Sequence, residues 1–158
     1  MFNFRRFLAL FRPELYTPFE LAQRDIAQRR YEDALIRLEE LAAQGDLPGE
    51  QRAAIVNKRG VALVHLERWD QARAAFEEAL EYSPAFAPAL VNLGNLQLES
   101  GEVEGAVRFY ERAVRSDDDY AAAHHNLGVA YKRLGRTSEA VRELRRAHKL
   151  EGRVVRKP

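Results

Sequence analysis

The sequence predicts an all-α protein, a superhelix of about four helix-turn-helix repeats, from its period and its composition. Residues of one kind return every 34 positions, and a fixed period of this length is typical of stacked repeat arrays. Ala, Leu, Glu, Arg and Gln, which are strong helix formers, dominate the chain. No stretch alternates apolar and polar residues as a half-buried strand does. The recurring residues are Gly60, Gly94 and Gly128, then Ala72, Ala106 and Ala140, then Phe76, Tyr110 and Leu144.

The first unit is expected over residues 15–48 and is the least regular of the four. Thr17, Pro18 and Glu20 together predict a helix start. Threonine caps a first helical turn, proline fits the first helical position, and glutamate two residues later completes a capping box. We expect helices at about 18–29 and 31–44, followed by a loop rich in Gly and Pro over residues 43–49.

Three regular units follow, over residues 53–86, 87–120 and 121–152. Each is expected to contain two amphipathic helices joined by a short turn, because Gly and polar residues interrupt the apolar pattern at its centre. In the third and fourth units these turns are Ser100-Gly101-Glu102 and Leu134-Gly135-Arg136. In the second unit the helices are expected to end near Leu66 and at Tyr82. Residues 1–13 precede the units as an amphipathic arm, and residues 153–158 follow them as a basic tail.

The small residues predict how the two helices of one unit meet. A glycine inside a helix costs roughly 1 kcal/mol relative to alanine, so its return at one register indicates close packing. The large residue that comes four positions after each recurring alanine is expected to fill the space beyond that close contact. Apolar residues such as Leu80 and Val114 then remain for the next unit to cover.

These residues resemble the tetratricopeptide repeat, a 34-residue helix-turn-helix unit. With Ala53, Ala87 and Ala121 as position 1, the glycines fall at position 8 and the alanines at positions 20 and 27, as they do in the family. Further matches are Leu93, Leu127, Tyr131 and Pro84. The departures are Arg59 for a leucine, Gln97 for the tyrosine, and Asp118 and Gly152 for the closing proline.

The resemblance implies a non-enzymatic scaffold or adaptor that binds a peptide or helix of another protein in a concave groove lined by the first helix of each unit. Asn92 and Asn126 recur at one groove position, and an asparagine amide both donates to and accepts from a peptide backbone. The other open interpretation is that these asparagines form hydrogen bonds between helices. The implied groove residues are Asn57, Lys58, Val61, Asn92, Asn95, Glu99, His125, Asn126, Val129, Lys132 and Arg133.

Other kinds of site are not expected. The carboxylate clamp found in chaperone adaptors of this family needs lysine, asparagine and arginine at set positions, and of these only Asn92 is present. The chain lacks a Gly-rich phosphate loop, a Gly-x-Ser-x-Gly elbow and a His-Glu-x-x-His motif, so we predict no catalytic residue, no metal site and no cofactor. It also has no cysteine, which excludes thiolate ligands and disulfides. His124 is expected in the core and His125 in the groove.

The two ends carry an alternative function, that of a structural protein that assembles into homo-oligomers or on a membrane surface. Residues 1–12 carry three arginines and residues 132–158 ten basic against three acidic side chains, whereas residues 13–131 carry 12 basic and 21 acidic ones. The arm places Phe4, Phe7, Leu8 and Phe11 on one helical face. It either caps the first unit, lies on an anionic membrane or docks on a partner.

At the other end no helix is expected after the fourth unit, so Val141 and Leu150 should face solvent. Nucleic acid is not expected as a partner, because no aromatic stacking platform accompanies the arginines. No run approaches the ~18 apolar residues of a membrane span. We therefore expect a cytoplasmic protein, with peripheral membrane contact through residues 1–13 left open.

Overall fold

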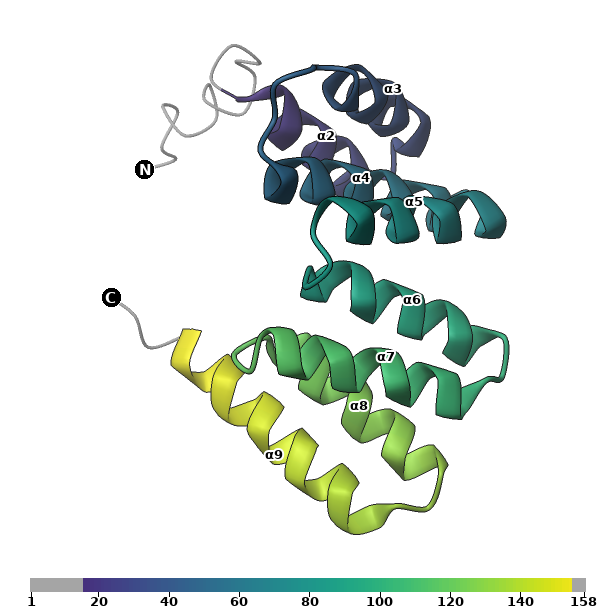
Figure 1. Ribbon diagram of the computed structural model, residues 1–158, viewed down its shortest axis with the longest axis vertical. Helices are drawn as coiled ribbons and strands as arrows, with labels where there is room; N and C mark the ends of the chain where they lie inside the picture. Colours follow the sequence, from purple (N-terminus) through teal and green to yellow (C-terminus); the bar gives the residue numbers. More distant parts are fainter. Residues whose placement is uncertain (1–15, 155–158) are drawn as a thin grey trace, which may run out of the picture.

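The computed structural model describes residues 16–154, which form eight α helices stacked along the long axis of the molecule (Figure 1). Each helix packs on the next one along the chain, and the first helices of successive units also touch one another. The all-α superhelix of four helix pairs is therefore confirmed. The helices are α2 (Pro18–Ala27), α3 (Tyr31–Ala42), α4 (Gly49–His65), α5 (Trp69–Tyr82), α6 (Ala87–Glu99), α7 (Val103–Ser116), α8 (Ala121–Arg133) and α9 (Thr137–Val154).

The start of α2 has the predicted capping box. The hydroxyl of Thr17 accepts a hydrogen bond from the backbone N–H of Glu20 at 3.2 Å, and the Glu20 carboxylate accepts one from the backbone N–H of Thr17 at 2.8 Å. Pro18 occupies the first turn, where its missing N–H leaves no bond unmade. Local sequence alone therefore sets the first described helix boundary.

The turn inside each unit requires one residue with a positive φ. Gly101 and Gly135 occupy this place in the third and fourth units with φ of 86° and 74°. Glycine adopts this conformation readily because it has no Cβ. The equivalent residues of the first two units are Arg29 and Glu67, with φ of 61° and 58°, and side chains there carry a steric cost. The two turns predicted around Gly101 and Gly135 are confirmed.

The predicted packing of small against large residues is also present. A Cβ atom added to Gly60 would lie 2.7 Å from Cδ1 of Phe76, and one added to Gly94 would lie 2.7 Å from Cδ1 of Tyr110. Real Cβ contacts are essentially never this short. In the fourth unit Leu144 takes the place of the ring against Gly128. Each glycine is thus the place where the two helices of a unit approach closely enough for an aromatic or leucine side chain to lie on backbone.

The C-terminal end departs from the prediction in one respect. Val141 is 40% exposed, as expected, but Leu150 is only 5% exposed. The prediction for Leu150 was wrong because Leu150 follows Ala140, Glu143 and Ala147 at helical spacing and shares the buried face of α9 with them. The arm over residues 1–13 and tail residues 155–158 lie outside the described part of the chain.

Two buried tyrosines predict how stability depends on pH. Burial raises the pKa of Tyr110 to about 12, and burial together with a hydrogen bond to Glu111 raises the pKa of Tyr131 to about 12. In the unfolded chain a tyrosine ionises near pH 10. The contribution of each tyrosine is therefore complete below pH 10 and is lost as the pH rises to about 12.

We expect the free energy of unfolding to fall by about 1.4 kcal/mol per pH unit for each of these two tyrosines above pH 10. Urea unfolding across this range would measure the slope. A variant carrying Tyr110→Phe and Tyr131→Phe should lose most of this slope. Equal slopes for the wild type and the double variant would contradict this assignment.

Candidate functional site

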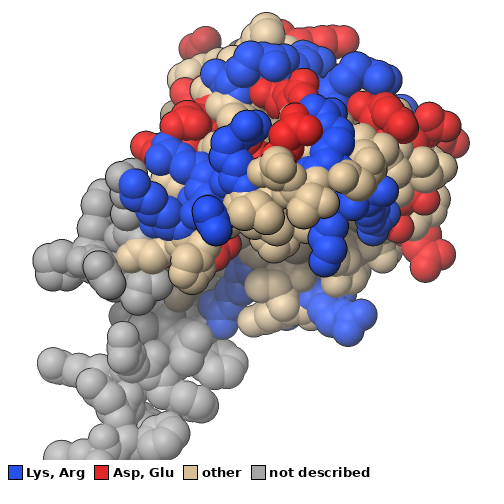
Figure 2. All heavy atoms as spheres, turned by 90° about the horizontal axis from the view of Figure 1, so that it is seen from below, with Lys and Arg blue, Asp and Glu red and all other residues tan. Residues whose placement is uncertain are grey.

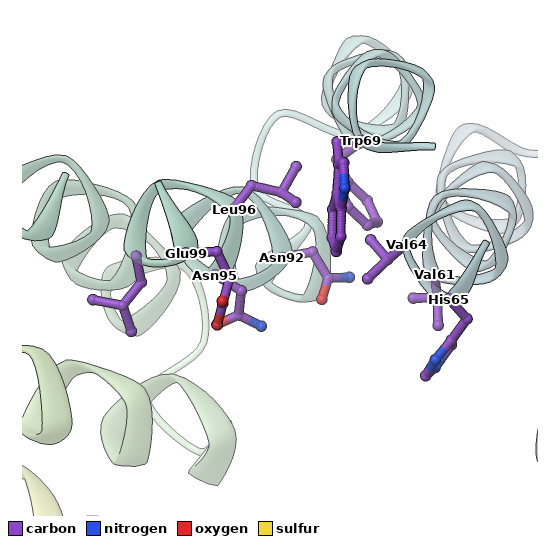
Figure 3. A pocket seen from close by; sticks show the side chains of 10 residues that line it. Val61, Val64, His65, Trp69, Asn92, Asn95, Leu96 and Glu99 are labelled. Atoms are coloured by element: carbon purple, nitrogen blue, oxygen red, sulfur yellow. The ribbon is translucent and has the colours of Figure 1, made fainter. Parts of the chain in front are cut away.

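A pocket of about 440 Å³ lies between the second and third units, where the ends of α4 and α6 face the start of α5 (Figure 3). Trp69 projects from α5 between the other two helices and is 48% exposed. A second pocket of about 340 Å³ shares Trp69, Leu96 and Glu99 with the first. The lining residues of the first pocket are Val61, Val64 and His65 of α4, Trp69 and Phe76 of α5, and Asn92, Asn95, Leu96, Leu98 and Glu99 of α6.

Helical spacing brings these side chains to one side of the superhelix. In α4 the lining residues are spaced by three or four positions, from Val61 to Val64 and His65, so they share a face. In α6 the same spacing links Asn92, Asn95 and Glu99. Because α6 contacts both α4 and α8, these faces form a continuous surface.

A chain of side-chain hydrogen bonds joins consecutive first helices across this surface. The Asn92 amide donates to Asn57 Oδ1 at 2.9 Å, and the Asn126 amide donates to Asn95 Oδ1 at 2.9 Å. The hydroxyl of Tyr110 also donates to Asn95 Oδ1, at 2.7 Å. The interpretation of the asparagines as bridges between helices therefore holds for Asn92 and Asn126. The two hydrogen bonds that Asn95 accepts both use its Oδ1 atom, so neither involves its side-chain nitrogen. Asn95 lines the pocket.

The structure brings some of the predicted groove residues together and separates others. Val61, Asn92, Asn95 and Glu99 line the pocket. Asn57 is only 5% exposed and lines neither pocket; its side chain accepts the hydrogen bond from Asn92. The remaining predicted residues line neither pocket: Lys58 is half-buried on α4, Asn126 and Val129 are half-buried on α8, and His125, Lys132 and Arg133 are exposed on α8. As expected, His124 is buried, at 3% exposure.

Sequence reasoning missed the most exposed apolar part of the site. Trp69 is the first residue of a second helix, and the prediction considered only first helices. Its equivalents in the other units are Tyr31, Val103 and Thr137, so the repeat pattern assigns this place no fixed residue. The available signal was composition, because Trp69 is the single tryptophan of the chain.

Neither a membrane span nor a metal site is evident in residues 16–154. No helix among them is long and apolar enough to cross a membrane. No three His, Asp or Glu side chains in this part of the chain converge as metal ligands would. What the site offers chemically is an apolar hollow with amide and carboxylate groups at its edge.

Comparisons with known proteins agree with this architecture. One tetratricopeptide repeat model matches residues 63–124 and again residues 97–151, and a second such model matches residues 19–87. The Lipoprotein NlpI homolog of Haemophilus influenzae is 29% identical over 102 residues, which is 65% of this chain and 32% of that protein. The chain spans a third or less of the length of the curated relatives that it matches.

Solved structures resemble the chain over most of its length. MamA superposes with a TM-score of 0.69 at 20% identity, covering 97% of this chain and 87% of MamA. The second TPR domain of Spaghetti (RPAP3), solved with an HSP90 peptide, superposes with a TM-score of 0.59 at 22% identity, covering 64% of this chain and 94% of that domain. Tetratricopeptide domains are generally protein–protein interaction modules and typically non-catalytic. The matched repeats span residues 19–151, and the chain belongs to the tetratricopeptide repeat family.

Proposed function

We propose that the chain is a non-enzymatic scaffold or adaptor that binds a peptide or helix of a partner protein in its concave groove. The observation that carries this proposal is the pocket at Trp69, which two consecutive units build together and which leaves a tryptophan half exposed. Tryptophan is enriched among the interface residues that dominate binding energy. The HSP90 peptide bound by the RPAP3 domain supports the same use of this fold.

The predicted groove residues have graded roles in this proposal. Val61, Asn92, Asn95 and Glu99 contact the partner at the pocket. Asn57 and Asn126 hold Asn92 and Asn95 in place through their hydrogen bonds. Lys58, His125, Val129, Lys132 and Arg133 extend the surface on either side along α4 and α8. No cofactor is needed for this function.

Replacing Trp69 by alanine is expected to lower recovery of the groove's partners from a cell extract at least about tenfold, since truncating an interface tryptophan commonly costs about 2 kcal/mol or more. Thermal stability should change little, because about half of the side chain is already in solvent. Ile36→Ala is the matched control, an exposed apolar residue on α3 outside both pockets. If both variants recovered the same proteins as the wild type, binding in the groove would be wrong.

Assembly through the ends is a second candidate, and one observation favours it. Val107 of α7 is 5% exposed in contact with the core shared with α8, whereas its equivalent on α9, Val141, is 40% exposed. Many Lys and Arg side chains lie on this end of the molecule, with Asp and Glu side chains among them (Figure 2). Light scattering of the full chain over a range of concentrations tests it: growth in mass that Val141→Glu abolishes supports assembly, and a constant monomer mass contradicts it.

A further inference from the structure

We propose that the partner segment bound at Trp69 is cationic and inserts one bulky apolar side chain into the pocket beside it. This inference rests on the proposed function and specifies the chemistry of the partner. Its two parts come from different observations, the shape of the apolar hollow and the charges at its edge.

The apolar part follows from the position of Trp69. Its side chain forms a wall that both pockets share, with Leu96 on the same boundary. Val61 and Val64 of α4 lie on the opposite side of Trp69 from Leu96 and Asn92 of α6 (Figure 3). A hollow of about 440 Å³ between an aromatic face and aliphatic side chains accepts a phenylalanine- or leucine-sized group. The exposed indole face also attracts a lysine or arginine placed over it.

The charge part follows from the carboxylates around this wall. Asp70 and Glu99 line the smaller pocket, and neither forms an ion pair with another described residue. Glu67 and Glu102, both exposed, lie in the two turns that adjoin the lining residues. These four carboxylates complement a positively charged segment.

Few cations oppose those carboxylates. Arg68 is engaged with Glu32 at 2.8 Å, which leaves Arg73 as the cation that lines the smaller pocket. Lys132 and Arg133 lie on α8 and line neither pocket, although Arg133, like Glu99, is near enough to Tyr110 to interact with it electrostatically. Complementary charge at the edge of an interface mainly selects the partner and speeds association, while the apolar anchor supplies affinity.

Selection from a phage-displayed library of short random peptides tests this inference on the full-length protein. Peptides that bind the wild type are counter-selected on Trp69→Ala. We expect the survivors to carry Phe, Trp, Tyr or Leu next to Lys or Arg and to be net positive. A synthetic copy of one survivor should shift the emission of Trp69, the single tryptophan, which reports binding at the pocket directly.

The carboxylates are tested with the same synthetic peptide. Asp70→Asn combined with Glu99→Gln should weaken its affinity at least about threefold and reduce the dependence on salt. The pair Glu39→Gln and Glu40→Gln, exposed carboxylates on α3, is the matched control and should leave the affinity unchanged. Survivors that are neutral or acidic, or an affinity that the first pair does not alter, would overturn the inference.

Two further outcomes separate this inference from other interpretations. If survivors depend on Trp69 but are acidic, the groove function stands and only the charge assignment fails. If no peptide distinguishes the wild type from Trp69→Ala, the inference is overturned together with the proposed function. A change in Trp69 emission on introducing Phe4→Asp and Phe7→Asp would show that the chain's own arm fills the pocket, which overturns a foreign cationic partner.

Discussion

Gly94→Ala is expected to lower the free energy of unfolding by about 2–3 kcal/mol, although alanine is the better helix former by roughly 1 kcal/mol. The added Cβ would lie 2.7 Å from Cδ1 of Tyr110 and closer still to Cε1. Tyr110 is fully buried and its hydroxyl donates to Asn95, so the ring has no free direction in which to move. Helices α6 and α7 must separate instead, and overpacking of this kind costs about 1–3 kcal/mol or more. Urea unfolding of both proteins measures the difference.

The same substitution elsewhere provides the control. Gly152 lies in α9 with nothing near the place of an added Cβ, so Gly152→Ala should raise the free energy of unfolding by up to about 1 kcal/mol. In a Tyr110→Ala background, Gly94→Ala should cost about 1 kcal/mol less than in the wild type, because the side chain that meets the added Cβ is gone. An equal cost of Gly94→Ala in both backgrounds would show that Tyr110 is not the obstacle.

This glycine explains why the fold was predictable from sequence. Close packing between two helices leaves a trace in the residue types, because only glycine fits beneath Tyr110 and only a large residue fills the space above Gly94. The trace recurs with the period of the repeat, so three copies support one another. The capping residues Thr17 and Glu20 act locally, so the helix start that they form could also be predicted from the sequence. The exposure of Leu150 was predicted wrongly, because Leu150 lies three positions after the buried Ala147 on the same face of α9.

The candidate site could be predicted only in part, because some of its contacts lie between units. Periodicity places Asn92, Asn95 and Glu99 on one face, and these residues do line the pocket. Asn57 is buried where Asn92 of the next unit donates a hydrogen bond to it, and the pattern within one unit does not contain that contact. Trp69 enters the pocket from a neighbouring helix at a place without a repeated residue type. Contacts between units therefore carried the information that sequence spacing lacked.

A buried polar pair in the fourth unit shows the same limit. His124 was predicted to be buried, but its partner was not identified. One ring nitrogen of His124 lies 2.8 Å from Glu143 Oε2, and the other lies 3.0 Å from the backbone carbonyl oxygen of Asp118. Both side chains are buried, and Arg142 donates to the second oxygen of Glu143 at 2.9 Å. In the third unit the equivalent residues are apolar, Leu90 and Phe109.

Asp118 explains why a polar pair is useful in this unit. It stands where the family has a proline that rigidifies the link between units, as Pro84 does after the second unit. The carbonyl oxygen of Asp118 is instead held by His124 and by the guanidinium of Arg146 at 3.1 Å. Side chains of α8 and α9 thus replace proline in positioning the connection between α7 and α8.

His124→Ala is therefore expected to lower the free energy of unfolding by about 3 kcal/mol, because it leaves the Glu143 carboxylate buried with Arg142 as its remaining partner. His125→Ala, at the exposed neighbouring position, should change it by less than about 0.5 kcal/mol. The double variant His124→Leu with Glu143→Phe introduces the residue types of the third unit. It should be nearly as stable as the wild type, since apolar replacement of a buried pair is often neutral. Chemical denaturation of all three variants measures these differences. If His124→Ala cost no more than His125→Ala, the pair would contribute nothing; if the double variant were the least stable, the anchor on Asp118 would outweigh the buried charge.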